Sequence, residues 1–253
     1  MQQKTFIRDF PFFYFIVLAG VKFAVGIGSE VFAQVHVIRI GAEAFAAKRL
    51  NQYCAFFYFF KYFLAAALAD GYLYFISLQV FSIIKTHHPT GNHARKIAVM
   101  PGAIATGWSD NKIRIYDSNS LEETHSFAAH DNSVFSVNYI ESKGNFPFLL
   151  SGGRDAKLNI WNVARNFELI KTIPAHWFTI NGIAFNSDKN IFATASRDKT
   201  VKIWGARSFE LLKVLDGNRG GHTHSVNTIL WLSENYLISA GDDKTIKVWR
   251  MGE

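Results

Sequence analysis

The sequence has almost no cysteine and no concentrated basic charge. Its single cysteine, Cys54, cannot form an intramolecular disulfide or a multi-cysteine metal site. This absence favours a reducing compartment, and we expect a cytoplasmic protein without a bound metal or cofactor. The net charge is +7, but no run of five or six Lys and Arg residues occurs. The charge pattern therefore argues against nucleic acid as a partner.

Signatures of several ligand and enzyme classes are also missing. The nine histidines and the cysteine do not follow a zinc-type spacing. Gly152-Gly153 and Gly220-Gly221 are the only glycine pairs of interest, and neither belongs to a phosphate-binding loop. The sequence indicates no small-molecule substrate.

Residues 1–60 differ in composition from the rest of the chain. The first 64 residues hold 13 of the 24 phenylalanines and only three acidic residues. Within them, Phe10 to Gly28 is a 19-residue apolar stretch interrupted by Lys22. Phe, Tyr, Val and Ile favour strands, so one interpretation is a set of irregular buried strands. The alternatives are a membrane anchor at residues 10–28 and a misread leader joined to an intact domain.

The segment after residue 92 contains an internal repeat. Four aspartates recur at separations of 45, 43 and 45 residues, each preceded four residues earlier by a hydroxyl residue and followed six residues later by an aromatic one. Each copy has a histidine upstream, followed at the fourth position by a β-branched residue. The aspartate-centred segments are IATGWSDNKIRIYD (104–117), LLSGGRDAKLNIWN (149–162), FATASRDKTVKIWG (192–205) and LISAGDDKTIKVWR (237–250).

This repeat resembles the WD-repeat family, whose period is about 40 to 45 residues with four strands per blade. The resemblance implies an all-β fold, a β-propeller of four-stranded antiparallel blades. We expect four clear blades, near 93–129, 130–175, 176–221 and 222–253, within a propeller domain at 61–253. A degenerate blade near 61–92 has Ala66, Asp70 and Ile76 at the hydroxyl, aspartate and aromatic positions. Residues 1–92 supply further irregular blades, or else the ring is incomplete.

The resemblance also implies a buried polar relay in each blade. In this relay the indole bonds to the hydroxyl, the hydroxyl to the histidine and the histidine to the aspartate. The expected sets are His93, Thr106, Asp110, Tyr116; His130, Ser151, Asp155, Trp161; His176, Thr194, Asp198, Trp204; and His222, Ser239, Asp243, Trp249. The first set departs from the others because it has a phenol for an indole and a short histidine-to-aspartate distance of 17 residues.

Ser, His and Asp also occur together in hydrolases. A catalytic triad is needed once, whereas these residues recur at the blade period together with a tryptophan. We therefore expect architecture and not catalysis.

The family's last blade is closed by an N-terminal strand, which here would come from about Lys4 to Leu18. Partners are expected on loops at one face, because loops carry function on rigid scaffolds. The sequence predicts a non-catalytic interaction scaffold for protein or peptide partners, with a membrane-tethered propeller as the alternative. The predicted partner-binding residues are Trp177, Phe178, Arg154, Arg197, Asn132, His224, Asp242 and Ser109.

Overall fold

The computed structural model is almost entirely β. It describes five two-residue strands before residue 55, and then residues 55–59, 63–67, 71–80, 82–89, 92–141, 147–186, 188 and 190–251. The chain divides into two units, Met1–His87 and His88–Glu253.

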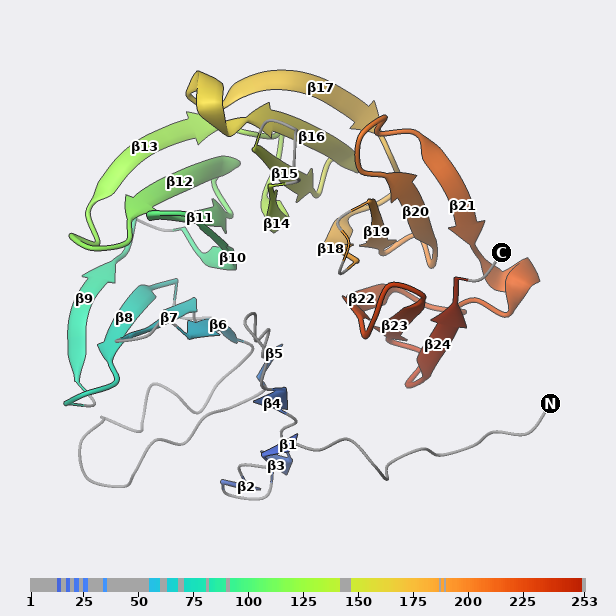
Figure 1. The fold of residues 1–253 in the computed structure, drawn as a ribbon, viewed down its shortest axis with the longest axis horizontal. Coiled ribbons are helices and arrows are strands. Elements are labelled where there is room, and N and C mark those ends of the chain that lie inside the picture. Colours follow the sequence, from blue (N-terminus) through green and yellow to red (C-terminus); the bar gives the residue numbers. More distant parts are fainter. Residues whose placement is uncertain are drawn as a thin grey trace. The chain divides into compact units, whose positions relative to one another are not determined.

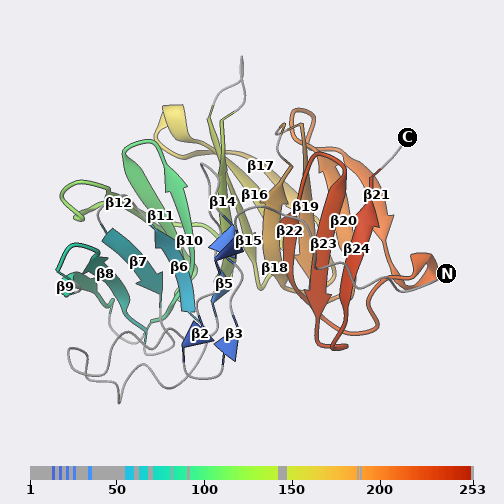
Figure 2. The same ribbon diagram turned by 60° about the horizontal axis from the view of Figure 1, so that its bottom comes forward.

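The second unit consists of four antiparallel sheets that follow one another along the chain (Figures 1 and 2). The first two sheets contain β10 (Ala94–Met100), β11 (Ala103–Trp108), β12 (Lys112–Asp117) and β13 (Glu123–Ala128), then β14 (Val134–Ile140), β15 (Phe148–Gly153), β16 (Lys157–Asn162) and β17 (Glu168–Pro174). The other two contain β18 (Ile180–Phe185), β19 (Ile191–Ser196), β20 (Val201–Gly205) and β21 (Leu211–Leu215), then β22 (Val226–Trp231), β23 (Tyr236–Gly241) and β24 (Ile246–Arg250). Two short 3-10 helices, η1 (Val163–Arg165) and η2 (Gly217–Arg219), lie in the loops.

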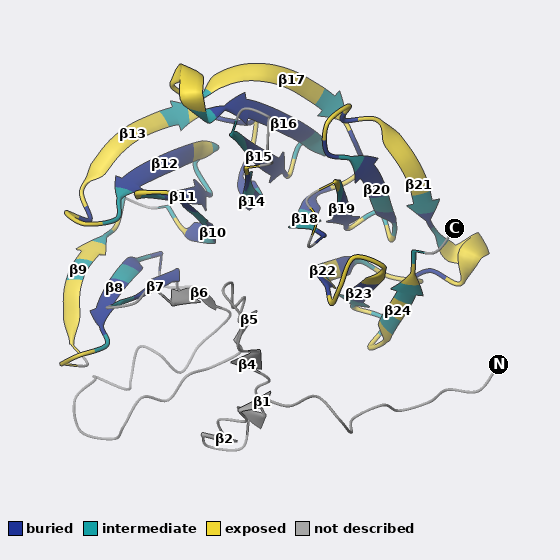
Figure 3. Cartoon of the chain, in the orientation of Figure 1, coloured by how far each residue is buried: buried dark blue, intermediate teal, exposed yellow. Residues whose placement is uncertain are grey.

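Within each sheet the strands pair in chain order, so that each strand lies beside its sequence neighbour. The middle strands are buried and the last strand of each four-stranded sheet is exposed (Figure 3). The register repeats as well: Leu149 faces Trp161, Phe192 faces Trp204 and Leu237 faces Trp249. The common register explains why the aromatic residue recurs ten residues after the hydroxyl.

Apolar layers fill the spaces between consecutive sheets of this unit. One layer joins the second and third sheets through Leu150, Ile160 and Phe192, which are fully buried. Side chains of the inner strands also bond to an adjacent sheet: Asn138 Nδ2 donates to the Ile183 carbonyl at 3.0 Å, and Trp231 Nε1 donates to the Ala184 carbonyl at 3.1 Å. The second, third and fourth sheets are therefore attached to one another along their innermost strands.

The first unit contains a sheet in the order β5 (Gln34–Val35), β6 (Ala55–Phe59), β7 (Phe63–Ala67), β8 (Leu73–Ser77) and β9 (Ile83–His87). Leu64 of β7 faces Ile76 of β8, which is the register that Leu149 and Trp161 have in the second unit. Ala66 and Ile76 thus occupy the positions predicted for a degenerate blade. The predicted aspartate of that blade, Asp70, lies outside the described residues.

Within the apolar stretch at residues 10–28, the described residues are those of four two-residue strands. β1 (Phe13–Tyr14) pairs with β4 (Val25–Gly26), and β2 (Val17–Leu18) pairs with β3 (Val21–Lys22). β1 and β2 lie in the range from which the closing strand of the last sheet was expected. The other residues of that range lie outside the described part of the chain. In the part of the chain that the structure describes, no helix has the length and apolar character needed to cross a membrane.

Candidate interaction face and its supporting relays

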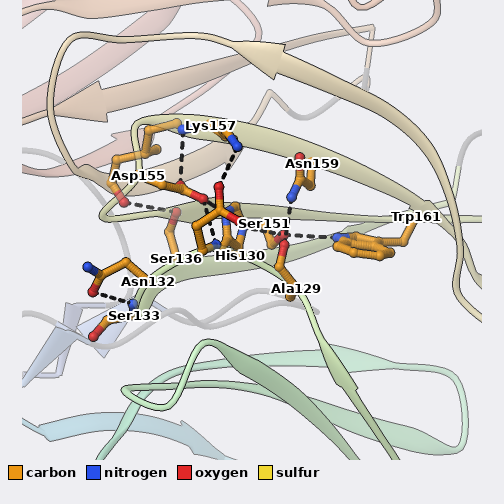
Figure 4. A network of polar contacts seen from close by, with 12 residues as sticks. Ala129, His130, Asn132, Ser133, Ser136, Ser151, Asp155, Lys157, Asn159 and Trp161 are labelled. Atoms are coloured by element: carbon orange, nitrogen blue, oxygen red, sulfur yellow. Dashed lines mark hydrogen bonds and ion pairs between the residues drawn. The ribbon is translucent and has the colours of Figure 1, made fainter.

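The second sheet contains a complete polar relay (Figure 4). Trp161 Nε1 donates to Ser151 Oγ at 2.9 Å, and Ser151 Oγ lies 2.8 Å from His130 Nε2. His130 Nδ1 lies 3.0 Å from Asp155 Oδ1. The other carboxylate oxygen accepts the Asp131 N–H at 3.0 Å. The relay therefore ties the turn before β16 to the loop before β14.

The third sheet repeats this arrangement. Trp204 Nε1 donates to Thr194 Oγ1 at 2.9 Å, Thr194 Oγ1 lies 2.7 Å from His176 Nε2, and His176 Nδ1 lies 2.8 Å from Asp198 Oδ2. Thr200 adds a hydroxyl that donates to Asp198 Oδ1 at 2.6 Å. The added hydroxyl gives this carboxylate one more donor than Asp155 has.

The fourth sheet contains the same relay. Trp249 Nε1 donates to Ser239 Oγ at 2.8 Å, and His222 bridges Ser239 at 2.8 Å and Asp243 at 2.9 Å. Thr245 donates to Asp243 Oδ1 at 2.7 Å, as Thr200 does in the third sheet. Three sheets in succession thus bring together all four members of their predicted sets.

The charge states follow from these contacts. Burial by itself would raise the pKa of Asp198, but hydrogen bonding and charge interaction with His176, and hydrogen bonds from Thr200 and the Trp177 N–H, lower it below its usual value. Burial lowers the pKa of His176. A neutral imidazole beside a carboxylate carries its proton on Nδ1, so Nε2 accepts from the hydroxyl and the hydroxyl accepts from the indole. Every donor in the relay therefore faces an acceptor.

The expected set in the first sheet is wrong. Ser109 N–H donates to the His93 carbonyl at 2.9 Å, as Arg154 N–H donates to the Ser133 carbonyl. His93 therefore occupies the position of Ser133 and not that of His130, which accounts for the short histidine-to-aspartate spacing. Its side chain is exposed and belongs to no relay.

Other residues satisfy the polar groups of the first sheet. Trp108 Nε1 donates to Thr106 Oγ1 at 2.6 Å. Trp108 therefore provides the indole donor, a role that the sequence analysis had assigned to the Tyr116 phenol. Arg114 binds Asp110 through both terminal nitrogens, at 3.0 and 2.6 Å, and its guanidinium lies 5.0 Å from the centre of a Trp108 ring. Trp108 stands where the next sheet has Gly153. A Cβ on Gly153 would lie 2.5 Å from His130 Nδ1. A side chain at this position thus takes the space that a histidine fills elsewhere.

The relay hydroxyls are closed to a substrate. Ser151, Thr194 and Ser239 are fully buried, and each hydroxyl oxygen is bonded to both an indole and an imidazole. A nucleophile must reach its substrate, and these three oxygens have no open side. No group of three or more His, Cys, Asp or Glu side chains that could hold a metal ion occurs among the residues that the structure describes.

The relays support the end of each sheet that carries the aspartate turn and the histidine loop, here called the turn face. Trp177 and Phe178 project from it, 86% and 58% exposed. Trp177 N–H donates to Asp198 Oδ2 at 3.1 Å, and the Phe178 carbonyl accepts from Ser196 Oγ at 3.1 Å. The backbone of this aromatic pair is therefore fixed to the blade while both rings face solvent.

The other predicted binding residues divide into two groups. Arg154 and Arg197 are exposed, and within the described ranges their side chains form no hydrogen bond or ion pair. The remaining four have local contacts: Ser109 Oγ with His93 N–H, Asn132 Oδ1 with Ser133 N–H, His224 with the Thr223 hydroxyl, and Asp242 with Asn227 Nδ2. The turn face thus combines free positive charge with two free aromatic rings.

Sequence reasoning missed a further pair on the same face. Arg95 of β10 lies over the ring of Phe135 of β14, with its guanidinium carbon 4.4 Å from the ring centre. Both residues sit where the register of their strand shifts, between Ala94 and Lys96 and between Val134 and Ser136. Bulges of this kind re-aim side chains, and no spacing rule in the repeat marks them.

Comparison with known proteins supports the repeat assignment. The family described as "WD domain, G-beta repeat" matches residues 121–162, 167–205 and 209–250. Nuclear distribution protein PAC1 of Arthroderma benhamiae is 27% identical over 177 residues, which is 66% of this chain and 37% of that protein. Actin-interacting protein 1 of Caenorhabditis elegans is 29% identical over 153 residues, which is 58% of this chain and 24% of that protein. The chain therefore spans well under half of these relatives.

A solved structure described as "Structure of U3-55K" matches the fold. Its TM-score is 0.64 at 21% sequence identity, and the match covers 76% of this chain and 58% of that one. Together with the repeated antiparallel sheets, this match confirms the predicted fold class of β-propeller blades.

Proposed function

Because this chain belongs to the WD-repeat family, we propose that it is a non-catalytic interaction scaffold that docks protein or peptide partners on its turn face. One relative is named for its interaction with actin, which supports a protein-binding role for the shared repeats. The three buried relays provide a rigid base, and the residues they carry provide the contacts.

The exposed pair Trp177 and Phe178 carries the proposal. Large aromatic side chains dominate binding energy at protein interfaces when they become buried there. Trp177 is 86% exposed, whereas the other five tryptophans of the chain are buried or partly buried. Its backbone is held by Asp198, so binding needs little ordering of the loop, which lowers the entropic cost of association.

The proposal is tested by selecting displayed random peptides on the purified protein and measuring the dissociation constants of the selected peptides. We expect Trp177→Ala to weaken binding of the selected peptides by about 2 kcal/mol or more, which raises the dissociation constant about 30-fold. Phe178→Ala should weaken them by a smaller amount, since less of its surface is available.

A matched control removes exposed apolar side chains elsewhere. Leu211 and Leu212 on the outer strand β21 are 46% and 57% exposed, and their replacement by Ala should leave the dissociation constants unchanged. If no peptide is enriched, or if selected peptides bind Trp177→Ala as tightly as the unmodified protein, the turn face is not the docking site.

A further inference from the structure

Arg95 contains a buried polar atom that the protein does not satisfy. Its Nε is shielded from solvent and bonds to no atom of the described residues. The guanidinium contacts the Phe135 ring, which stabilises positive charge but offers no hydrogen-bond acceptor along the N–H directions. Buried polar groups in folded proteins are nearly always paired, so an unpaired Nε–H is a reason to look for a ligand.

The same position in the later sheets is satisfied. The register shifts at Asn181 in β18 and at Asn227 in β22, as it does at Arg95 and Phe135. Asn181 Nδ2 donates to the Val226 carbonyl at 2.9 Å, and Asn227 Nδ2 donates to Asp242 Oδ1 at 2.5 Å. Among these four equivalent bulge residues, Arg95 alone is left with an unmatched donor.

A second arginine, Arg154, acts on the first electrostatically. Burial lowers the pKa of Arg95, and repulsion from the positive charge of Arg154 lowers it further. Arg154 follows β15 in the turn before β16, and its N–H is fixed to the Ser133 carbonyl at 2.9 Å. Neither guanidinium has a carboxylate partner among the described residues. Because the Arg95 guanidinium lies over Phe135, two residues beyond Ser133, both arginines belong to the same part of the turn face. Among the described residues, no carboxylate offsets their repulsion.

We propose that Arg95 and Arg154 form an oxyanion site on the turn face, which binds a carboxylate or phosphate group displayed by a docked acidic peptide. This inference rests on the proposed docking function and specifies the charge of the partner. A planar guanidinium with free N–H groups binds such oxyanions with short charge-assisted hydrogen bonds. An anion here would satisfy the buried Nε–H and remove the repulsion between the two arginines.

The surrounding residues fit an extended acidic segment. Arg197 is exposed at the corresponding turn of the next sheet, and Trp177 and Phe178 lie on the same face. Aromatic anchors beside free cations are suited to a peptide that alternates apolar and acidic residues. The small total charge of +7 is spread along the chain, so it does not provide the dense field that a nucleic-acid surface needs.

The site itself is tested by NMR of arginine Nε–H groups in the full-length protein, titrated separately with inorganic phosphate and with N-acetylglutamate. We expect one slowly exchanging Nε–H signal, absent in Arg95→Lys, to shift on titration with either probe. Arg154→Gln should raise the dissociation constant of whichever anion binds by about tenfold, since one charged hydrogen-bonding partner is lost. Arg207→Gln, which removes an exposed charge beyond β20, should have no effect.

The source of the anion is distinguished with three fluorescent peptides of one sequence that carry glutamate, phosphoserine or glutamine at the central positions. Tighter binding of the glutamate or phosphoserine peptide than of the glutamine peptide, abolished by Arg154→Gln, supports the proposal and identifies the group. An Nε–H signal that responds to neither small anion overturns the oxyanion site. Oligouridylate that binds through Arg154 more tightly than every acidic peptide overturns the peptide assignment.

Failure of the docking function is distinguishable from failure of this site. Trp177→Ala should reduce peptide binding but leave the response of the Arg95 signal to inorganic phosphate intact. If the phosphate response persists while no peptide binds, the oxyanion site stands without the peptide-docking function.

Discussion

Arg114 binds both carboxylate oxygens of Asp110, whereas the corresponding aspartates of the next three sheets bind a histidine. The side chains of Arg114 and Asp110 are only 8% and 18% exposed. Both arrangements give a hydrogen-bonding partner to a largely buried aspartate carboxylate at a tight turn. An ion pair with a planar guanidinium replaces the imidazole in the first sheet because Trp108 fills the imidazole's place.

Arg114→Met is expected to destabilise the protein by about 2–4 kcal/mol, because it leaves the Asp110 carboxylate without its partner in a largely buried position. Chemical denaturation measures the free energy of unfolding. Combining Arg114→Met with Asp110→Asn should recover part of the loss, since the orphaned charge is then removed. A double variant that loses the sum of the two single effects would show that the pair is not coupled.

Asp198→Ala should lower the free energy of unfolding by about 2–4 kcal/mol, because it leaves the His176 Nδ1–H and the Trp177 N–H without an acceptor. Asp131→Ala serves as the control. Asp131 is exposed and pairs with Lys157 at the surface, where such pairs contribute about 0–1 kcal/mol. An unchanged thermal midpoint for Asp198→Ala would contradict the role assigned to the relay.

Acidification should destabilise the protein in a predictable order. The pKa of His176 is lowered from 6.5 in the folded chain, so below about pH 6.5 the unfolded chain binds a proton that the folded chain does not, and stability falls. The pKa of Asp198 is also lowered, from 3.8, so its contribution is present above about pH 4 and is lost at lower pH. Urea denaturation across this range should show a flatter dependence near pH 6 for His176→Gln. Parallel curves for the two proteins would exclude His176 as the titrating group.

Gly153→Ala should destabilise the second sheet by about 2 kcal/mol or more, because the new Cβ overlaps Asp155 Oδ1 and the imidazole of His130. Gly217→Ala is the matched control, because nothing lies within 4 Å of the Cβ that it adds. Equal thermal midpoints for the two variants would show that the relay can shift to accommodate a methyl group.

The resemblance of the repeat to the WD-repeat family implied the relays of the second, third and fourth sheets, and the repeat spacing located their members because each relay lies within a single sheet. A hydroxyl and an aromatic ten residues apart face the same layer once β15 and β16, or their equivalents, pair in the common register. The repeated spacing thus marked the hydroxyl and the aromatic, and the family resemblance supplied their bonds to the histidine and the aspartate. Exposure of Trp177 and Phe178 could likewise be expected, since both follow the histidine in a loop.

The first sheet was predicted incorrectly because its histidine was assigned to the wrong position. Only the backbone bond between Ser109 and His93 reveals the three-residue offset. A signal was present in Trp108, a large residue where the later repeats have Gly153, Ser196 and Gly241. Arg95 could not be found in this way, because its significance lies in contacts with a neighbouring sheet about 40 residues away.

The inner-strand bonds have a mechanical consequence. Asn138 and Asn181 each attach one sheet to the next, while the relays lie wholly within single sheets. A chain pulled from its two ends must therefore separate the sheets across their apolar layers and also break the relay inside each sheet. Extension in optical tweezers should proceed as discrete steps, each releasing one repeat of about 45 residues and about 150 Å of contour length.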